Sequence, residues 1–414
     1  MFLGRVRRFD RRFKRAIILL TLAGIVALFV ATNIGRYTAV SLAAEAHNLA
    51  LRQIGLDPTR AEIDALWRIK RDRSELLTRE HLARFYRSAE PGLQRLFQVA
   101  GMDPEHGLIR CGRADQAFLI SSRVFESDDH GRSYRMRPNT RSVWLRRVTL
   151  INGPFGMFQV LETPEIHEAA RGARAIVEMS SVQTTNSWGC RGPEPDTSAT
   201  MRGLVLGDSF MQGMFVGDLD TPSQYLERYL CKAWNLPVCV LNTGHIGYSP
   251  EQYFYTLLEY GERFRPDFVV VSVCPNDFGD GTEVIWGHGD WWSEAEYWLG
   301  EILRWCRGHD TLCVLVPVPC EEQFRGSRID AAYPGQVAKI FHGSARLYCD
   351  PLDEFIDDHL RLTRVAKREG KYFGKSLLYN GQFGDNHFSP RGAELWGQIV
   401  GRRVTLLLTP RQRS

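Results

Sequence analysis

The sequence predicts an α/β protein whose main domain has three layers, with a parallel sheet between two layers of helices. Two observations lead to this fold class. From residue 201 onwards, short apolar runs alternate with amphipathic stretches of helical length, a pattern typical of repeated strand–helix units. One of these runs, DFVVVSVC at 267–274, is apolar almost throughout, as expected of a strand that is buried on both faces.

The N-terminus predicts a membrane anchor. Residues 1–15 carry seven basic side chains and one acidic side chain, and the twenty residues at 16–35 carry no charge, which is about the length that crosses the hydrocarbon core of a bilayer. The positive-inside rule then predicts a single-pass protein with a cytoplasmic N-terminus and with the rest of the chain in the periplasm or outside the cell. A cleaved signal peptide is the alternative, with a weak cleavage candidate at 39–41.

Charge and cysteine usage exclude several other classes. Beyond residue 15 the chain carries 45 basic and 47 acidic residues, so no nucleic-acid partner is expected. The nine cysteines include two near-neighbour pairs, Cys231/Cys239 and Cys306/Cys313, and either pair could form a disulfide in an oxidising compartment. No cysteine and histidine spacing suggests zinc, and no phosphate-binding glycine loop is present, so neither a metal nor a cofactor is expected.

The pattern divides the chain into four parts: the basic segment and anchor at 1–35, membrane-proximal helices and a small β-rich region at 36–200, the α/β domain at 201–408, and a tail at 409–414. In the second part, FLISSRVF, SVWLRRVTLING and MFQVLE predict short strands. In the α/β domain we expect strands at 203–207, 237–242, 267–274 and 312–318, a short fifth strand at 346–350, and helices near 221–233, 251–264, 294–307, 328–342, 351–368 and 390–406.

Candidate site residues follow the strands of the α/β domain, because sites in such sheets form at the carboxyl ends of the strands. Gly207-Asp208-Ser209 follows the first strand and places a serine hydroxyl at the start of a helix, near N–H groups that favour negative charge. The second strand leads to a turn with Gly247, and the third to Asn276, whose amide could donate to an oxyanion. Each of these features alone is also typical of an ordinary turn or helix cap.

A fourth motif lies near the C-terminus, where Asp385 and His387 are two residues apart. In an extended loop this spacing directs both side chains to the same side. The carboxylate can then hold one imidazole nitrogen while the other faces a serine, as triad chemistry requires. Ser389 and Pro390 follow as an expected N-cap and first helical residue.

Taken together, GDS, glycine, ND and D-x-H resemble the four sequence blocks of the SGNH (GDSL-like) hydrolase superfamily, over about 200–408. The segments TNSWGCRGPEP and RPDFVVVSVCPNDF look like those of its membrane-attached bacterial members. The resemblance implies a flavodoxin-like domain in which Ser209 is the nucleophile, His387 the general base and Asp385 its orienting partner. It also implies an oxyanion hole formed by the N–H groups of Ser209 and Gly247 and the side chain of Asn276.

The chain departs from the family pattern at two positions. Cys274 stands where the family often has glycine, two residues before the Asn of the third block. The final pair has the spacing D-x-H where many members have D-x-x-H, and Gly384 occupies the longer-spaced position. Only Asp385 can therefore serve as the acidic partner, a spacing similar to that of the acetyltransferase-like and membrane-attached branches.

The resemblance implies a carboxylic ester hydrolase that forms an acyl-serine intermediate, and an outward-facing member of this kind is expected to deacetylate cell-envelope glycans. One alternative is an O-acyltransferase that moves acetyl groups onto polysaccharide, and another is an inactive envelope protein that binds glycan or an assembly partner. Substrate contacts are expected from Asp208 and from the aromatic insert at 284–292, which contains Trp286, Trp291 and Trp292. This insert offers stacking faces for a sugar, but it could equally bind a lipid acyl chain or form local core. The oligomeric state is left open.

Overall fold

The computed structural model describes the chain from residue 83 to residue 409. Gaps in this description lie at 84–85, 88, 112–116, 129–132, 148–156, 279–290, 325–332, 334, 341–346, 371–375 and 381–386. The described residues belong to one compact unit. The anchor expected at 16–35 lies outside them, and no described helix has the length and apolar character needed to cross a membrane.

The core of the protein is a parallel sheet of four strands in the order β11-β10-β8-β9. The strands are β8 (Met201–Leu206), β9 (Val238–Asn242), β10 (Phe268–Val273) and β11 (Leu312–Pro317). All residues of β8, β9 and β10 are buried, because helices cover both faces of the sheet. In chain order the strands lie second, first, third and fourth, which is the flavodoxin-like order.

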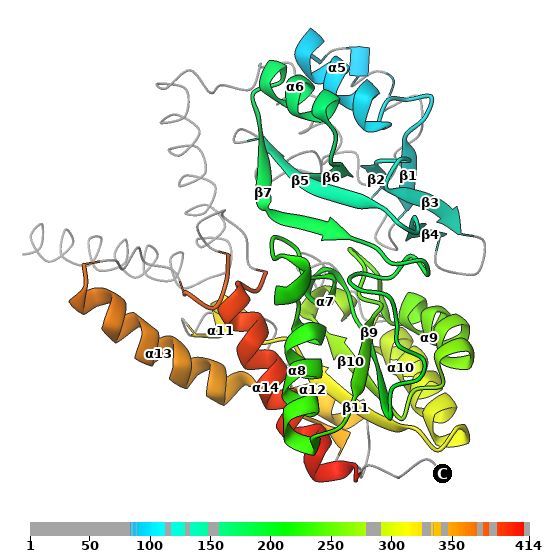
Figure 1. Ribbon diagram of the computed structural model, residues 1–414, viewed down its shortest axis with the longest axis vertical. Coiled ribbons are helices and arrows are strands. Elements are labelled where there is room, and N and C mark those ends of the chain that lie inside the picture. The colour runs from blue at the N-terminus through cyan, green and yellow to red at the C-terminus, as the bar shows by residue number, and fades with distance from the viewer. Residues whose placement is uncertain are drawn as a thin grey trace, which may run out of the picture. The chain divides into compact units, whose positions relative to one another are not determined.

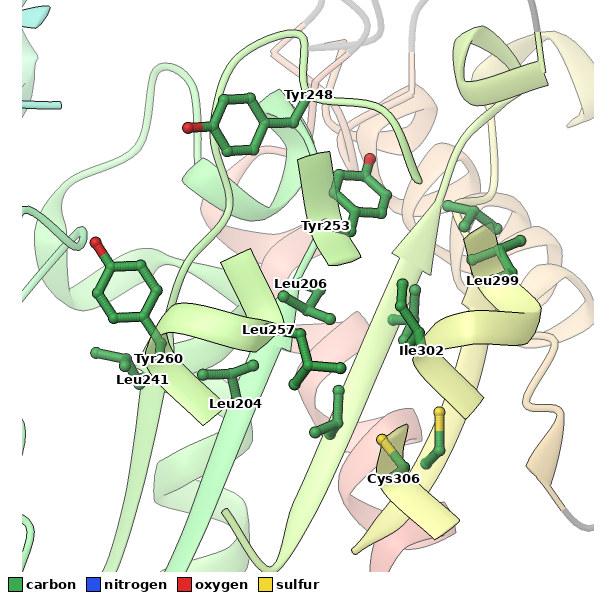
Figure 2. Close-up of a cluster of buried hydrophobic side chains, with 14 of the residues drawn as sticks. Leu204, Leu206, Leu241, Tyr248, Tyr253, Leu257, Tyr260, Leu299, Ile302 and Cys306 are labelled. Atoms are coloured by element: carbon green, nitrogen blue, oxygen red, sulfur yellow. The ribbon is translucent and has the colours of Figure 1, made fainter. Parts of the chain in front are cut away.

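Two layers of helices enclose this sheet (Figure 1). One face packs against α8 (Pro222–Trp234), α13 (Leu352–Arg368) and α14 (Pro390–Leu407), around the buried Trp396. The other face packs against α9 (Pro250–Phe264) and α10 (Trp291–Gly308). Figure 2 shows this second core, in which Leu204 and Leu206 of β8 lie near Leu257 of α9 and Ile302 of α10. The predicted three-layer α/β domain is confirmed.

The region before residue 201 forms a smaller α+β layer. Its three-stranded antiparallel sheet has the order β6-β5-β7, and α5 (Pro91–Ala100) and α6 (Pro164–Gly172) pack together with it around Leu93, Phe97 and Val143. The strands of this sheet are β5 (Arg141–Arg147), β6 (Met157–Leu161) and β7 (Ala175–Thr184). Two hairpins precede it, β1-β2 (Leu108–Cys111, Ala117–Ile120) and β3-β4 (Phe125–Asp128, Ser133–Met136).

Several sequence expectations need correction. FLISSRVF is not one strand, because a turn at 122–124 separates β2 from β3. Among the described residues, the expected fifth parallel strand consists of one isolated bridge between Leu315 and Tyr348. The helix expected at 328–342 is described only as α12 (Gly335–Ile340). The eight cysteines whose side chains the structure describes, which include both expected disulfide pairs, are free thiols.

Candidate active site

Ser209 lies at the carboxyl end of β8, as the first residue of the short helix α7 (Ser209–Gln212). The strand ends at Leu206, and Gly207 allows the backbone to pack closely against Met211, since a Cβ at residue 207 would lie 2.4 Å from the Met211 side chain. Asp208 is the N-cap of α7, and its carboxylate accepts a hydrogen bond from the Phe210 N–H at 3.0 Å. The chain therefore turns so that Ser209 follows a buried strand directly.

The His387 imidazole meets the serine. Its Nε2 lies 2.6 Å from Ser209 Oγ, a hydrogen-bond distance across 178 residues of sequence. The Asn380 N–H donates to the His387 carbonyl at 2.8 Å, and the Phe210 ring packs on the imidazole with ring centroids 4.6 Å apart. Backbone and ring contacts thus hold His387 in an orientation that suits proton transfer from Ser209.

Immediately after His387, Ser389 caps α14 as expected. Its Oγ accepts from the Gly392 N–H at 3.2 Å, and Pro390 is the first helical residue. The helix start therefore fixes the segment that carries the histidine. Asp385, the expected acidic partner, lies outside the described residues.

Asp208, the residue before the serine, belongs to a buried series of hydrogen-bonded polar side chains. The Cys274 thiol donates to Asp208 Oδ2 at 2.9 Å, and the Cys274 N–H donates to Asp277 Oδ2 at 2.7 Å. The Tyr253 hydroxyl donates to Asp277 Oδ1 at 2.8 Å. Asp208 and Asp277 are only 1% and 6% exposed, so the substrate contact expected for Asp208 does not fit its position. Its carboxylate caps the nucleophile helix instead.

Burial determines which side chains of this hydrogen-bonded series carry a proton. It raises the pKa of Asp277 well above its ordinary value, and the nearby Asp208 carboxyl raises it further. Burial, followed by Asp208 and Asp277, also raises the pKa of the Cys274 thiol well above its ordinary value. Cys274 is therefore a neutral hydrogen-bond donor at physiological pH and not a reactive thiolate.

The remaining expected residues follow the neighbouring strands. Gly247 lies in the turn after β9, with φ of 64°, a left-handed conformation that favours glycine. Asn276 lies in the short 3-10 helix η3 (Pro275–Phe278) directly after β10, and its side chain is outside the description. Trp286 is likewise outside the described residues. Trp291 and Trp292 begin α10, with side chains that are not described.

The structure adds residues that the sequence did not point to. Gln212, at the end of α7, is fully buried and accepts a hydrogen bond from the Ile246 N–H at 2.6 Å. Tyr134, from β4, donates its hydroxyl to the Ile246 carbonyl. Both contacts adjoin Gly247. They join segments far apart in the chain, and no motif of the sequence pointed to them.

An aromatic cluster lies on α9 and α10. Trp298 contacts Phe254 and Tyr255 with ring centroids 5.6 and 5.7 Å apart, and contacts Tyr297 at 5.0 Å. Tyr297 is 58% exposed. The described part of the chain therefore carries exposed aromatic surface on the helix that follows the expected aromatic insert.

One group of possible metal ligands occurs among the described residues. Asp103, Glu105 and His106 have ligand atoms within 4.8 Å of one another. They lie in the turn after α5, where Asp103 already accepts from the Glu105 N–H and from His106 Nδ1. These internal hydrogen bonds account for the cluster as a turn.

Comparisons with known proteins add little to this geometry. Neither a protein-family model nor a curated protein sequence matches the chain. Among solved structures, a lipase/acylhydrolase from Enterococcus faecalis is 18% identical, with a TM-score of 0.31, over 51% of this chain and 100% of its own. The esterase EstA from a Pseudoalteromonas species is 13% identical, with a TM-score of 0.34, over 50% and 97%.

A third similar structure is LAE5, an α/β hydrolase enzyme from the metagenome of Lake Arreo, Spain. It is 14% identical, with a TM-score of 0.38, over 50% of this chain and 97% of its own. All three TM-scores lie below 0.5, so we infer the function from the geometry of the site.

Proposed function

We propose that this protein is a serine ester hydrolase of the SGNH type that works through an acyl-serine intermediate. The observation that carries the proposal is the 2.6 Å separation of Ser209 Oγ and His387 Nε2. A serine hydroxyl is a weak nucleophile until an adjacent base accepts its proton. His387 takes this proton as Ser209 attacks an ester carbonyl, then returns it to the leaving alcohol. Water completes the cycle by hydrolysing the acyl-serine.

In this proposal three donors stabilise the tetrahedral oxyanion: the N–H groups of Ser209 and Gly247 and the side chain of Asn276. Each of the three residues lies in the segment that follows one of three neighbouring parallel strands, β8, β9 and β10. This supports the assignment, because such strand ends meet at one edge of a sheet. Asp385 orients the His387 ring and stabilises the imidazolium that forms.

For the substrate we propose an acetylated glycan of the cell envelope. The exposed Tyr297 and its aromatic neighbours on α9 and α10 support this choice, since aromatic faces can stack on sugar rings. The basic N-terminus and the uncharged segment at 16–35 support a membrane-attached protein with its catalytic domain outside the cytoplasm. Recovery of the full chain in the soluble fraction after gentle cell lysis would contradict this location.

The nucleophile is tested with a fluorophosphonate probe, which labels activated serines. We expect labelling of the wild-type protein, complete loss of labelling in Ser209→Ala, and unchanged labelling in Ser198→Ala, which alters an exposed serine in a loop. A well-folded wild-type protein that is not labelled would contradict the proposed enzyme activity and favour a glycan-binding protein.

The substrate needs a separate experiment. We expect acetate release from acetylated envelope polysaccharide by the wild-type protein and none by Ser209→Ala. Acetate that appears instead on an added glycan acceptor would identify an O-acyltransferase, because both reactions pass through the same acyl-serine.

A further inference from the structure

The turn that carries Gly247 is held by side chains of other segments. Ile246, the residue before Gly247, donates its N–H to Gln212 Oε1 at 2.6 Å, and its carbonyl accepts from the Tyr134 hydroxyl. Tyr248, the residue after Gly247, donates its hydroxyl to the Tyr134 carbonyl at 2.6 Å. Both chain neighbours of Gly247 therefore bind Tyr134, which belongs to the β-rich region and not to the α/β domain.

The contact with the Ile246 carbonyl has a direct consequence for Gly247. The Ile246 carbonyl and the Gly247 N–H belong to one planar peptide group, in which the two point in opposite directions. A hydroxyl that fixes the carbonyl oxygen therefore also fixes the direction of the Gly247 N–H. The Tyr134 hydroxyl, together with the weaker contact of His245 Nδ1 at 3.3 Å from the same carbonyl oxygen, thus orients the N–H that we assign to the oxyanion hole.

A cluster of buried amides fixes the hydrogen bond between the Ile246 N–H and Gln212. Gln212 Nε2 donates to Gln159 Oε1 at 2.9 Å and to Gln183 Oε1 at 3.1 Å. This arrangement leaves Gln212 Oε1 as the acceptor that faces the Ile246 N–H, since a flipped amide would place donor against donor. Gln159 comes from β6 and Gln183 from β7, so the small sheet decides the orientation of a side chain on the nucleophile helix.

The amide groups of Gln159 and Gln183 also have hydrogen-bond partners beyond Gln212. Gln159 Nε2 donates to Ser142 Oγ at 2.9 Å and to Gln183 Oε1 at 3.1 Å, and Gln183 Nε2 donates to the Gly213 carbonyl at 3.1 Å. Gln212, Gln159 and Gln183 are 0%, 5% and 1% exposed. Buried amides with every partner in place are rigid and have a single arrangement.

We propose that Tyr134, Gln159, Gln183 and Gln212 are positioning residues for the oxyanion hole, so that the β-rich region completes the active site of the α/β domain. The inference rests on the proposed function. It predicts that these residues act on the transition state and leave substrate binding unchanged, because the oxyanion forms only as the ester carbonyl is attacked.

The test is Tyr134→Phe, which removes one hydroxyl and keeps the ring. Removal of a whole oxyanion donor typically lowers turnover by a factor on the order of 10²–10³; a donor that is misaimed is expected to lower kcat by about tenfold, with KM for a soluble acetyl ester changed less than about twofold. The affinity for a boronic acid, which forms a tetrahedral adduct on the serine, should fall in parallel with kcat.

The matched control is Tyr260→Phe, which removes a buried hydroxyl that donates to the Trp188 carbonyl at 2.9 Å, away from Ile246. It should keep kcat and boronate affinity. If Tyr134→Phe does not fold, as judged by its melting temperature, Gln183→Met is measured instead and should show the same fall in kcat.

The outcomes separate the two proposals. A wild-type protein that is not labelled by fluorophosphonate and hydrolyses no ester overturns the proposed function, and the positioning role falls with it. An active wild-type protein whose Tyr134→Phe and Gln183→Met variants keep kcat within about twofold, or change only KM, overturns the positioning role alone.

Discussion

At the scale of single residues, Asp277 is an uncommon feature of the site. Its carboxyl group is 6% exposed and belongs to the same series of hydrogen-bonded side chains as the Asp208 carboxyl. The Cys274 thiol and N–H connect the two carboxyl groups, because the thiol donates to Asp208 and the N–H donates to Asp277. Its two oxygens accept from the Cys274 N–H and the Tyr253 hydroxyl. These two hydrogen bonds favour the charged form, yet burial dominates and raises the pKa of Asp277 well above its ordinary value.

The raised pKa of Asp277 predicts how stability depends on pH. The folded protein holds the Asp277 proton more tightly than the unfolded chain, so its contribution to stability is fully present below the unfolded pKa of about 3.9 and is lost as pH rises towards the folded pKa. Asp277→Asn removes this loss. Relative to the wild type, the variant should gain about 1.4 kcal/mol of unfolding free energy for each pH unit across that window.

The measurement is urea unfolding of both proteins at intervals from pH 4 to pH 8. Asp196→Asn is the control, since hydrogen bonds from Ser198 lower the pKa of this exposed carboxyl, and its difference from the wild type should be constant above pH 5. Parallel curves for Asp277→Asn and the wild type would show that Asp277 is charged in the folded protein.

The sequence predicted some site residues and missed others for a physical reason. Ser209 and His387 could be found because each lies in a short motif whose local geometry suits its chemistry, at a strand end or before a capped helix. Gln212 and Tyr134 could not, because their role depends on where β4, β6 and β7 meet the turn after β9. No spacing along the chain encodes that contact.

At the scale of elements, the sequence again predicted some parts of the structure and missed others. The strands of the parallel sheet were predictable, because burial on both faces requires continuous apolar runs such as FVVVSV in β10. The antiparallel β7 (Ala175–Thr184) and the short α6 were not predicted as separate elements. In β7 buried Ser181 and Gln183 replace apolar residues, and this polar character hides the strand pattern.

Glycine residues on α14 and α10 predict opposite effects of the same substitution. Gly397 of α14 packs against α8, where an added Cβ would lie 2.7 Å from the Leu226 backbone nitrogen. Gly397→Ala should therefore force the helices apart and cost about 1–3 kcal/mol of unfolding free energy. At Gly300 of α10, no atom of the described residues outside its own helix backbone lies within 4 Å of an added Cβ, so Gly300→Ala should stabilise the protein by about 0.5–1 kcal/mol.

Both variants are compared with the wild type by urea unfolding at one pH. Helix propensity alone favours alanine at both positions, so the opposite signs isolate the contact between α14 and α8. If Gly397→Ala were as stable as Gly300→Ala, the close packing of these two helices would be wrong.

At the scale of the whole molecule, Arg191 joins the β-rich region to the α/β domain. Its side chain is fully buried, pairs with Asp218 at 2.9 Å and donates to the Val216 carbonyl at 2.8 Å. Asp218 also accepts from the N–H and hydroxyl of Thr184, at the end of β7. Burial lowers the pKa of Arg191 to about 10, against the opposing effect of Asp218, so the guanidinium is charged at neutral pH and needs this partner.

Asp218→Ala is therefore expected to lower the stability of both parts together. It leaves a buried guanidinium without its carboxylate, which typically costs about 3–5 kcal/mol of unfolding free energy. About 3 kcal/mol is expected here, because the Asp218 side chain is 24% exposed and water can replace part of the contact.

Arg141→Ala is the control, since it removes a more exposed ion pair with Glu162, also 2.9 Å long, and such pairs contribute about 0–1 kcal/mol. Urea unfolding followed by fluorescence and by circular dichroism should give one coincident, shifted transition for Asp218→Ala. Two separate transitions, with only one of them shifted, would mean that the β-rich region and the α/β domain fold independently and that Arg191 does not couple them.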